Sequence, residues 1–511
     1  MDALSSLIEG LGAALTPMNL LWVCVGAVLG TAVGVLPGLG SAMAVALLLP
    51  ITFTLDPTSA LIMFAGVYFG GMFGDATSAI LLNTPGTSAA IATTFEGHRM
   101  ALDGRAPQAL AAAAVGAFIG GVLATLVVVF SAEQMVQLAL KLGPEDYFAI
   151  AVFAFVATSA IVAESVIRGL TSIAIGLTIA MVGVESISGA TRLTAGVPEL
   201  FDGISIVVIT VGLLALGEVF NVAASAGKGG PEQVLGTGRP WLGRHEWRQA
   251  APAWLRGTAF GLPFGVIPAG GAEIPTFLAY GTERALDGRN EPRRFGKGAI
   301  QGVAAPEAAG NATAGTAIGA LLALGLPTSA TAAILIAAFQ QYGLQPGPLL
   351  FTGESELVWT LLASLLVGSV VLLVLNLGFA PLWAKLLVIP KAYLYAGITV
   401  FCALGVWSTS ATVVDLWLVL GIGALGWVMR RYDIPLAPVL IAVVLGPLAE
   451  TRFRQALAIS QGDATVLVTS PFSAVLYAIL VLGLVVAVVI RQRRRRPARS
   501  SYNASASSSR R

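Results

Sequence analysis

The sequence Leu82-Asn83-Thr84-Pro85-Gly86-Thr87-Ser88 interrupts a long apolar run at its end. Proline lacks a backbone N–H and glycine disfavours a helix, so an α-helix should end here. A broken helix leaves N–H groups free at one end and C=O groups free at the other, and these attract anions and cations. The stretch adds one amide and three hydroxyls. We therefore predict a substrate- or ion-binding tip at Asn83, Thr84, Pro85, Gly86, Thr87 and Ser88.

The composition is that of a protein embedded in a membrane. Of the 511 residues, 56% are hydrophobic and only 11% are charged, and the mean hydropathy is +0.84. A soluble domain is about 25% charged, so most of this surface must face lipid or other helices. A spanning helix needs about 20 apolar residues. The candidate spans are 18–36, 58–82, 107–130, 144–163, 166–184, 201–221, 254–280, 356–378, 382–408, 412–429, 432–449 and 468–490.

Two further apolar segments, 38–54 and 297–340, are interrupted by Gly, Pro, Ser and Thr. Such segments form short, discontinuous or re-entrant helices, which membranes tolerate where protein or a wet cavity covers them. We predict an all-α polytopic membrane protein with about 11–14 membrane segments, some of them paired re-entrant or broken helices.

Three motifs recur in the same order in the two halves of the chain. Gly34-Val-Leu-Pro37-Gly38-Leu-Gly40 is echoed by Gly265-Val-Ile-Pro268-Ala-Gly270-Gly271, Gly74-Asp75-Ala-Thr77-Ser78 by Gly310-Asn311-Ala-Thr313-Ala314, and Thr84-Pro85-Gly86-Thr87-Ser88 by Leu326-Pro327-Thr328-Ser329. The second half should therefore supply a second binding tip at Pro327, Thr328 and Ser329. The small residues Gly38, Gly40, Ser41, Gly270 and Gly271 would let the backbone approach an ion or a facing helix closely.

The charged loops suggest that the two halves are inverted. In the first half, the loop at 55–57 has no basic residue and the loop around Arg99 and Arg105 is basic. In the second half the order reverses, because the loop 284–297 is basic and the segment 341–356 has no Lys or Arg. Since basic loops face the cytoplasm, corresponding loops fall on opposite faces of the membrane. This pattern indicates an inverted-topology repeat, in which transporters place binding sites at broken helices.

Acidic and amide residues within apolar runs are candidates for an ion site, because buried carboxylates are costly and often functional. Asp75 aligns with Asn311 in the repeat, and Glu307 follows Pro306 close to Asn311. We treat Asp75, Asn311 and Glu307 as a secondary group of ion-coordinating candidates. Each could equally be a hydrogen-bonded helix end.

The repeat divides the chain into segments with different expected roles. The expected organisation is a first repeat half at 1–222 with motifs 34–41 and 74–100, a cytoplasmic linker at 223–253, a second repeat core at 254–380 with motifs 265–271 and 305–331, C-terminal helices forming a scaffold or interface at 381–490, and a basic, disordered tail at 491–511. The arginines from Arg491 to Arg499 place the C-terminus in the cytoplasm.

Several functional classes fit the sequence poorly. The only two histidines lie in charged loops, so a Ser-His or His-metal site within the membrane is not expected, and we predict neither an enzyme nor a resident cofactor or metal. No G-x-x-x-x-G-K-[ST] run occurs, and the basic tail alone does not indicate nucleic-acid binding. The leading interpretation is a secondary transporter. A channel or uncoupled pore for small solutes is the alternative, and a structural scaffold for partner subunits is a third.

The motifs together resemble the large membrane subunit of the tripartite tricarboxylate transporter family. The resemblance rests on Gly34 to Gly40, Tyr68-Phe-Gly-Gly71, Leu82 to Gly86 with Glu96-Gly-His-Arg-Met100, Phe295-Gly-Lys-Gly298, Val303 to Glu307, Leu324-Gly-Leu-Pro327, Gly343-Leu-Gln-Pro-Gly-Pro348, Ala437-Pro438, Gly446, Glu450 and Gln461-Gly-Asp463. It departs from the family pattern at Gly310-Asn311, at Pro327-Thr328 and at Glu96.

The resemblance implies an importer in the bacterial inner membrane, driven by a sodium ion or a proton. A periplasmic solute-binding protein would deliver an organic anion, such as citrate or another di- or tricarboxylate, and a small membrane subunit of about four helices would accompany this chain. By analogy with related carriers, it also implies an elevator-type mechanism and a possible homodimer.

Overall fold

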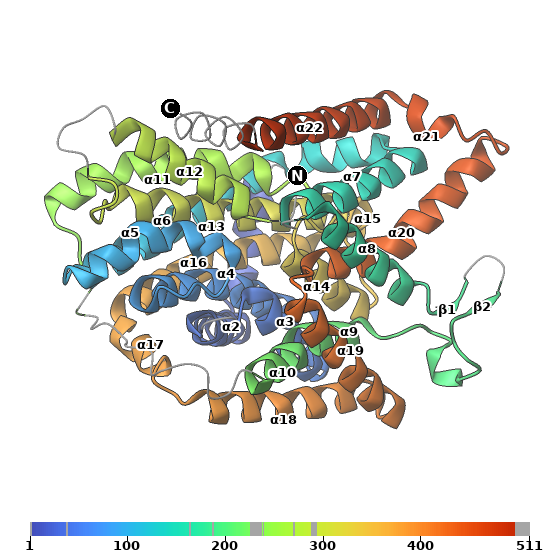
Figure 1. Ribbon diagram of the computed structural model, residues 1–511, viewed down its shortest axis with the longest axis horizontal. Coiled ribbons are helices and arrows are strands. Elements are labelled where there is room, and N and C mark those ends of the chain that lie inside the picture. The colour runs from blue at the N-terminus through green and yellow to red at the C-terminus, as the bar shows by residue number, and fades with distance from the viewer. Residues whose placement is uncertain are drawn as a thin grey trace, which may run out of the picture.

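The computed structural model describes residues 3–36, 39–162, 165–185, 189–224, 238, 240–268, 271–287 and 294–495. Nearly all of this chain is helical (Figure 1). Within the described residues, the strands are β1 (Gly183–Val184) and β2 (Thr191–Arg192), which pair antiparallel. The predicted all-α class is confirmed.

The helices follow one another in two series along the chain. The first series is α1 (Ala3–Ala14), α2 (Pro17–Val35), α3 (Ser41–Leu48), α4 (Pro57–Leu82), α5 (Ile91–Leu102), α6 (Ala106–Lys141), α7 (Pro144–Val162), α8 (Val166–Ala180), α9 (Ile206–Thr210) and α10 (Gly217–Ala224). The second is α11 (Arg244–Phe264), α12 (Glu273–Asp287), α13 (Gln301–Leu324), α14 (Ala330–Gln341), α15 (Pro348–Gly353), α16 (Ser355–Gly378), α17 (Ala380–Leu386), α18 (Lys391–Ser410), α19 (Val413–Arg431), α20 (Ala437–Ile459), α21 (Val466–Thr469) and α22 (Pro471–Arg495).

Four short helical turns of other types connect these elements. They are the 3₁₀-helices η1 (Leu49–Thr54), η2 (Ser88–Ala90) and η3 (Pro198–Leu200), and the π-helix η4 (Val211–Leu216). The π-helix links α9 to α10, so the three elements together form the apolar segment predicted at 201–221.

Six helical segments in the described part of the chain are long and apolar enough to cross a membrane. They are Pro17–Val35, Pro57–Leu82, Ala106–Lys141, Ile206–Ala224, Ser355–Gly378 and Val413–Arg431. Shorter apolar helices of 10–17 residues accompany them, such as α8 and α14. The chain is therefore a multi-pass membrane protein, and the expected total of 11–14 segments stays a prediction.

Glycines hold α2 tightly against α4. A Cβ added to Gly26, Gly30 or Gly34 would lie 2.3–2.5 Å from a backbone oxygen of α4. These glycines recur every fourth residue, so they line one face of α2 and allow backbone-to-backbone contact. The same face ends at Gly34, where the first recurring motif begins.

The pair α11 and α13 repeats this packing in the second half. A Cβ on Gly257, Gly261 or Gly265 would lie 2.2–2.3 Å from a backbone oxygen of α13. The three glycines have the same spacing as those of α2, and Gly265 opens the motif that echoes Gly34. The two halves therefore share a packing pattern as well as sequence motifs.

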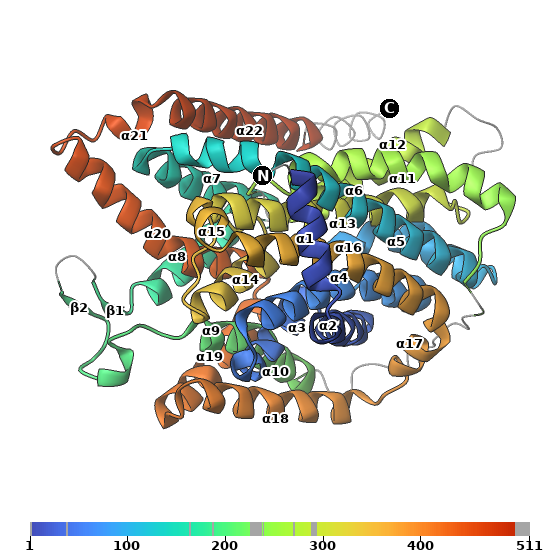
Figure 2. The same ribbon diagram turned by 180° about the vertical axis from the view of Figure 1, so that it is seen from behind.

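The helices α4 and α13 form the centre of the molecule (Figures 1 and 2). In α4, 94% of the apolar window is buried, so this helix packs against protein rather than lipid. Every residue of α13 from Gln301 to Ala323 is buried. The long helix α6 packs against both central helices, and α16 packs against α4 and α6.

Several expected boundaries differ from the structure, and α6 and α20 extend to Lys141 and Ile459, beyond the predicted ends at 130 and 449. The span predicted at 254–280 is two helices, α11 and α12, because Gly265, Pro268 and the left-handed Gly271 (φ 117°) interrupt it. The span predicted at 382–408 is divided between α17 and α18 before Pro390. Helix α11 begins at Arg244, inside the segment expected to be a linker.

At the C-terminal end, α22 extends to Arg495, beyond the expected start of the tail at 491. Its last turn contains Arg491 and Arg493 to Arg495, which continue the helix because arginine is a good helix former. The rest of the predicted tail, 496–511, lies outside the described residues.

Candidate functional site

The first helix break follows α4. Asn83 ends α4 in the left-handed region, with φ 56°, which asparagine adopts more readily than most residues. About two turns earlier, the Asp75 carboxylate accepts hydrogen bonds from the backbone N–H of Gly86 at 2.5 Å and of Thr87 at 3.0 and 3.1 Å, and from the Thr87 hydroxyl. Asp75 thereby satisfies N–H groups that the break frees and holds the tip against α4.

The other predicted residues of this tip have different partners. The Thr84 hydroxyl donates to the carbonyl of Leu82 at 3.2 Å, which satisfies one of the free C=O groups at the end of α4. Pro85 has no N–H to donate. Ser88 begins η2 and, unlike Thr84, directs its hydroxyl to another part of the chain.

The second break lies between α13 and α14. Gly325 ends α13 with φ 68°, matching Asn83 at the end of α4. Ser329 caps α14, because its hydroxyl accepts a hydrogen bond from the N–H of Ala332 at 3.2 Å. Pro327 lies between them, and the Thr328 side chain is buried. The sequence therefore located both helix breaks.

Each half supplies a short helix that contacts the break of the other half. The hydroxyls of Ser41 at the start of α3 and Thr331 in α14 lie 3.1 Å apart. In the opposite sense, the Ser88 hydroxyl donates to the Glu273 carboxylate of α12 at 2.6 Å. The two halves are thus joined by reciprocal contacts next to the breaks.

The supporting small residues lie close to the first break where the structure describes them. A Cβ on Gly40 would meet the Thr87 side chain at 3.0 Å, and a Cβ on Gly71 would meet Ser41 at 2.7 Å. Gly271 adopts φ 117°, where an L-residue would be strained. Gly38 and Gly270 lie outside the described residues.

Two buried oxygen atoms near the breaks lack hydrogen-bond partners among the described residues. They are Oδ1 of Asn311 and Oε2 of Glu273. On α13, the Asn311 amide donates to the backbone carbonyl of Glu307 at 3.1 Å, and the Glu307 carboxylate accepts from the Thr93 hydroxyl at 2.5 Å. Both oxygens could coordinate a cation, and the Glu273 carboxylate could also accept a proton. Glu273 is one of the acids that the sequence places in or near an apolar run, although it was not among the predicted site residues.

The packing corrects one alignment made from the motifs. Gly34 contacts the carbonyl of Gly71, and Gly265 contacts that of Thr313. Gly71 lies twelve residues before Asn83 in α4, and Thr313 lies twelve residues before Gly325 in α13. With α4 and α13 matched in this way, Asp75 corresponds to Ala317 and not to Asn311. The motif alignment was misleading because Gly and Ala are frequent in both helices.

A cavity of about 690 Å³ opens beside the first break. Its lining includes Asn83, His98, Arg99, Tyr280, Arg284 and Phe295. We call it the Asn83 cavity. Its volume lies within the range of small-molecule sites, and its two guanidinium groups favour carboxylate ligands. The sequence placed these arginines in basic loops, and only the fold shows that they meet at the tip.

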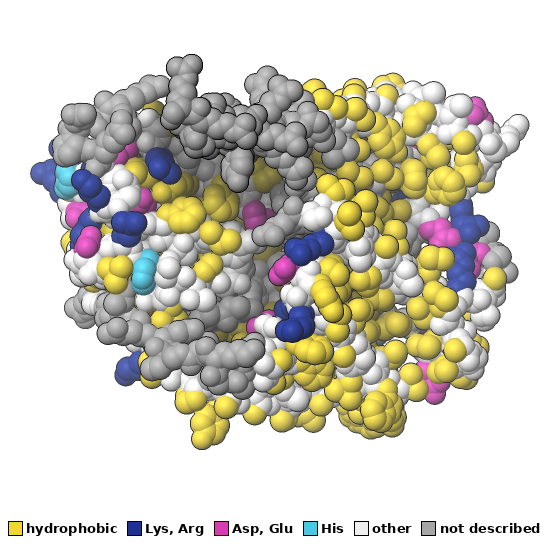
Figure 3. Space-filling model, in the orientation of Figure 1, with side chains coloured by type: hydrophobic (Ala, Val, Ile, Leu, Met, Phe, Trp, Pro, Cys, Tyr) yellow, Lys and Arg dark blue, Asp and Glu magenta, His cyan; other side chains and the backbone are white. Residues whose placement is uncertain are grey.

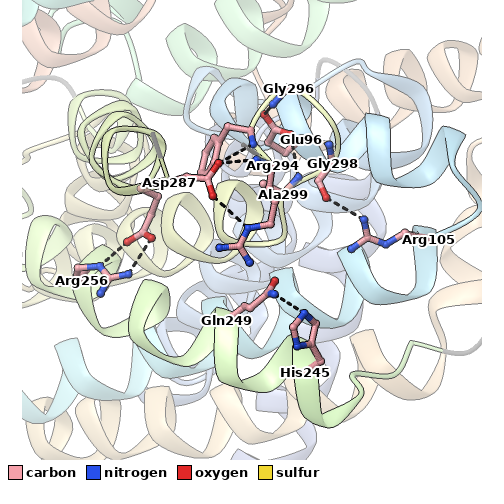
Figure 4. A network of polar contacts seen from close by, with 12 residues as sticks. Glu96, Arg105, His245, Gln249, Arg256, Asp287, Arg294, Gly296, Gly298 and Ala299 are labelled. Atoms are coloured by element: carbon pink, nitrogen blue, oxygen red, sulfur yellow. Dashed lines mark hydrogen bonds and ion pairs between the residues drawn. The ribbon is translucent and has the colours of Figure 1, made fainter. Parts of the chain in front are cut away.

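The wall of the Asn83 cavity is fixed by Glu96 (Figure 4). This fully buried carboxylate accepts hydrogen bonds from the backbone N–H of Gly296 at 2.7 Å, Gly298 at 2.9 Å and Ala299 at 3.0 Å. Arg105 donates to the carbonyl of Gly298 at 3.0 Å from the other side. Glu96 therefore joins α5 to the loop before α13, which explains a buried acid without a catalytic role.

A second acid anchors the same loop. Asp287, at the end of α12, accepts hydrogen bonds from the N–H of Arg294 at 2.7 Å, the Arg294 side chain at 3.1 Å and the N–H of Phe295 at 3.1 Å. Burial alone would raise the pKa of Asp287, but these hydrogen bonds and the Arg294 charge outweigh it and hold the pKa below its ordinary value.

Comparisons with known proteins give one consistent result. Residues 20–441 match the profile of the "Tripartite tricarboxylate transporter TctA family". A protein of Agrobacterium vitis, "Uncharacterized 52.8 kDa protein in TAR-I ttuC' 3'region", is 40% identical over 491 residues, covering 96% of this chain and 97% of that protein. A second, "Uncharacterized protein in TAR-II ttuC' 3'region", is 40% identical over 225 residues, covering 44% of this chain and 91% of that protein. No solved structure matches the chain significantly.

Proposed function

This chain belongs to the tripartite tricarboxylate transporter TctA family, and we propose that it is the subunit through which an ion-coupled importer moves an organic anion. The observation that carries the proposal is the Asn83 cavity, where a broken helix in the membrane meets Arg99 and Arg284. A guanidinium group binds a carboxylate through two parallel hydrogen bonds. A di- or tricarboxylate such as citrate, or another organic acid, is the cargo that this chemistry favours.

The proposed transport cycle uses both helix breaks. The shared glycine packing, the matched left-handed residues Asn83 and Gly325, and the reciprocal contacts support an inverted repeat with one tip from each half. Transporters of this architecture bind solute where such breaks meet. An elevator-type movement of the pair of tips would then carry the anion across the membrane.

The coupling ion would bind near the tips. The unpartnered oxygens of Asn311 and Glu273, with the buried Glu307, are the candidate ligands for a sodium ion. The Glu273 and Glu307 carboxylates are the candidate acceptors of a proton. Asp75 is occupied by the N–H groups of the first break, so we assign it a positioning role in place of direct ion coordination.

The proposed assembly lies in the bacterial inner membrane with the C-terminus in the cytoplasm. A small four-helix membrane subunit and a periplasmic solute-binding protein would complete it, and two copies of this chain could pair. The basic side chains over α5 and α11, at the left edge of Figure 3, support a cytoplasmic position for that side of the molecule.

The test is uptake by proteoliposomes that contain all subunits. Sodium and pH gradients are imposed separately, with citrate, succinate and benzoate as radiolabelled solutes. A coupled carrier accumulates one of them above its external concentration only while a gradient is present. Equilibration without a gradient would instead identify a pore, and no uptake of any of the three by correctly inserted protein would contradict the proposed cargo.

A further inference from the structure

A second cavity, of about 340 Å³, lies beside the second helix break. Its lining includes Tyr147, Gly325, Gln340, Gln345, Leu349 and Arg452. We call it the Arg452 cavity. Gly325 corresponds in α13 to Asn83 in α4, so the two cavities occupy matched positions in the two halves.

Arg452, on α20, has unused hydrogen-bonding capacity. One terminal nitrogen donates to the Gln455 side chain at 3.2 Å, and the guanidinium lies 4.9 Å from the centre of the Tyr147 ring. Its Nε is buried and has no hydrogen-bond partner among the described residues. Among the described residues, Arg452 forms no ion pair. The side chain as a whole is only partly buried, so the unsatisfied group is this one N–H donor, which a buried acceptor would satisfy.

Arg454, two residues further along α20, differs from Arg452 because it forms an ion pair. Arg454 pairs with Glu450 at 2.9 Å, and Glu450 also pairs with Arg192 at 3.0 Å. Arg454 does not line the cavity. The charge of Arg452 is therefore left for a ligand in the cavity, where the Gln340 and Gln345 amides can add hydrogen bonds.

The position of the Arg452 cavity indicates which side it serves. Apart from Arg452, its lining includes residues 345–349, from the segment 341–356 that has no Lys or Arg. The Asn83 cavity is instead lined by Arg99 and Arg284, from the two segments rich in basic residues. Both views of the ribbon place α5 toward one side of the molecule and α15 and α20 toward the other (Figures 1 and 2). By the charge rule, α15 and α20 lie on the extracytoplasmic side.

We propose that the Arg452 cavity is an extracytoplasmic docking site for an organic anion. A carboxylate of the anion binds the Arg452 guanidinium before the anion reaches the helix breaks. This inference rests on the proposed function for the direction of transport. It adds a site, with a stated ligand chemistry, that is separate from the Asn83 cavity. The Tyr147 ring orients the guanidinium, and the cavity entrance lies beside the exposed Leu349.

The first experiment measures ligand binding without transport. Leu349→Cys, in a chain with Cys24→Ser and Cys402→Ser, is labelled by a membrane-impermeant maleimide in right-side-out vesicles. We expect labelling from outside, slowed at least fivefold by citrate, succinate or benzoate at millimolar concentration. Arg452→Gln should abolish this protection, Arg452→Lys should retain part of it, and Arg454→Gln should leave it unchanged. Protection that survives Arg452→Gln, or labelling only from inside, would overturn the proposal.

The second experiment measures uptake of the protecting solute by the full complex. Arg452→Gln should raise KM at least tenfold with little change in maximal rate, and Arg454→Gln should match the parent. Arg452-dependent protection without gradient-driven uptake would defeat the proposed transport function and leave the docking site standing. Normal KM in Arg452→Gln, in protein that accumulates the solute, would defeat the docking site alone.

Discussion

The Asp75 carboxylate and the Thr87 backbone N–H are joined by hydrogen bonds of 3.0 and 3.1 Å that cross the first helix break. The Thr87 hydroxyl donates to the same carboxylate. One acid in α4 thus fixes the position of a tip twelve residues further along the chain. Because hydrogen bonds to a charged group are stronger than neutral ones, this contact stabilises the tip more than an ordinary turn would.

Asp75→Asn should weaken the first tip. The amide oxygen of asparagine can still accept, but its NH₂ group would face the donors of Gly86 and Thr87. We expect a loss of about 1.5–3 kcal/mol in stability and a large drop in uptake. Thermal unfolding of the purified protein and uptake by proteoliposomes measure the two effects. Asp103→Asn, on an exposed turn, is the control, and parental behaviour of Asp75→Asn would refute the positioning role.

Asn83→Gly should separate the chemistry of the tip from its backbone shape. Glycine adopts the left-handed conformation of Asn83 freely, so the variant should fold, but it removes the amide from the Asn83 cavity. Asn83→Ala also removes the amide, and in addition it strains the left-handed backbone by about 1–2 kcal/mol. We expect both variants to lose most uptake and only Asn83→Ala to lower the melting temperature. Full uptake by Asn83→Gly would exclude the amide from the site, and Asn221→Ala serves as the control.

Gly30→Ala should disrupt the packing of α2 on α4. Its Cβ would lie 2.5 Å from the Val67 carbonyl oxygen, so the helices must separate, at a cost of about 1–3 kcal/mol. Gly261→Ala, against Ala309, should behave in the same way. Gly421→Ala is the matched control, because its Cβ meets nothing within 4 Å. Yield and thermal unfolding compare the three, and a Gly30→Ala protein as stable as Gly421→Ala would contradict the close packing.

Asp287→Asn should destabilise the loop before α13 in a pH-dependent manner. The pKa of Asp287 is lowered in the folded protein, so its stabilising effect is complete above the unfolded value of about 4 and is lost as pH falls through the folded value. The melting temperature of Asp287→Asn should therefore lie below that of the parent at pH 7, and the gap should close below about pH 4. A gap independent of pH would show that the Asp287 charge is not responsible.

Much of this architecture follows from local sequence. Pro85 and Pro327, each close to a glycine, located both helix breaks. Proline alone was not sufficient, because Pro306 lies inside α13 without ending it. Long apolar runs located α2, α4 and α16 within one residue at each end, whereas α6 begins one residue before its predicted span and extends to Lys141, beyond the predicted end at 130. The division of 254–280 into α11 and α12 was missed, because hydropathy does not register a break between two apolar stretches.

The candidate site was only partly predictable. The residues of the tips are adjacent in sequence, so the motifs revealed them. Arg99 of α5 and Arg284 of α12 both line the Asn83 cavity although they are far apart in the chain, and Glu273 contacts Ser88 from the other half. Such contacts depend on how the helices pack, and the hydrophobic periodicity of a single segment does not predict which other helix it will contact.

The matched positions Asn83 and Gly325 are not interchangeable. A side chain at Gly325 would lie 2.4 Å from the carbonyl oxygen of Pro346, whereas the Asn83 side chain looks into open space. If the halves descend from one duplicated gene, the two copies have since acquired different residues at this position. The first tip has space for the polar side chain of Asn83. The second tip has glycine at the matched position, which allows the loop at Pro346 to pack directly against its backbone. Grafting asparagine at position 325 would therefore not create a second Asn83 site, because two helix breaks of the same backbone conformation differ in the space around them.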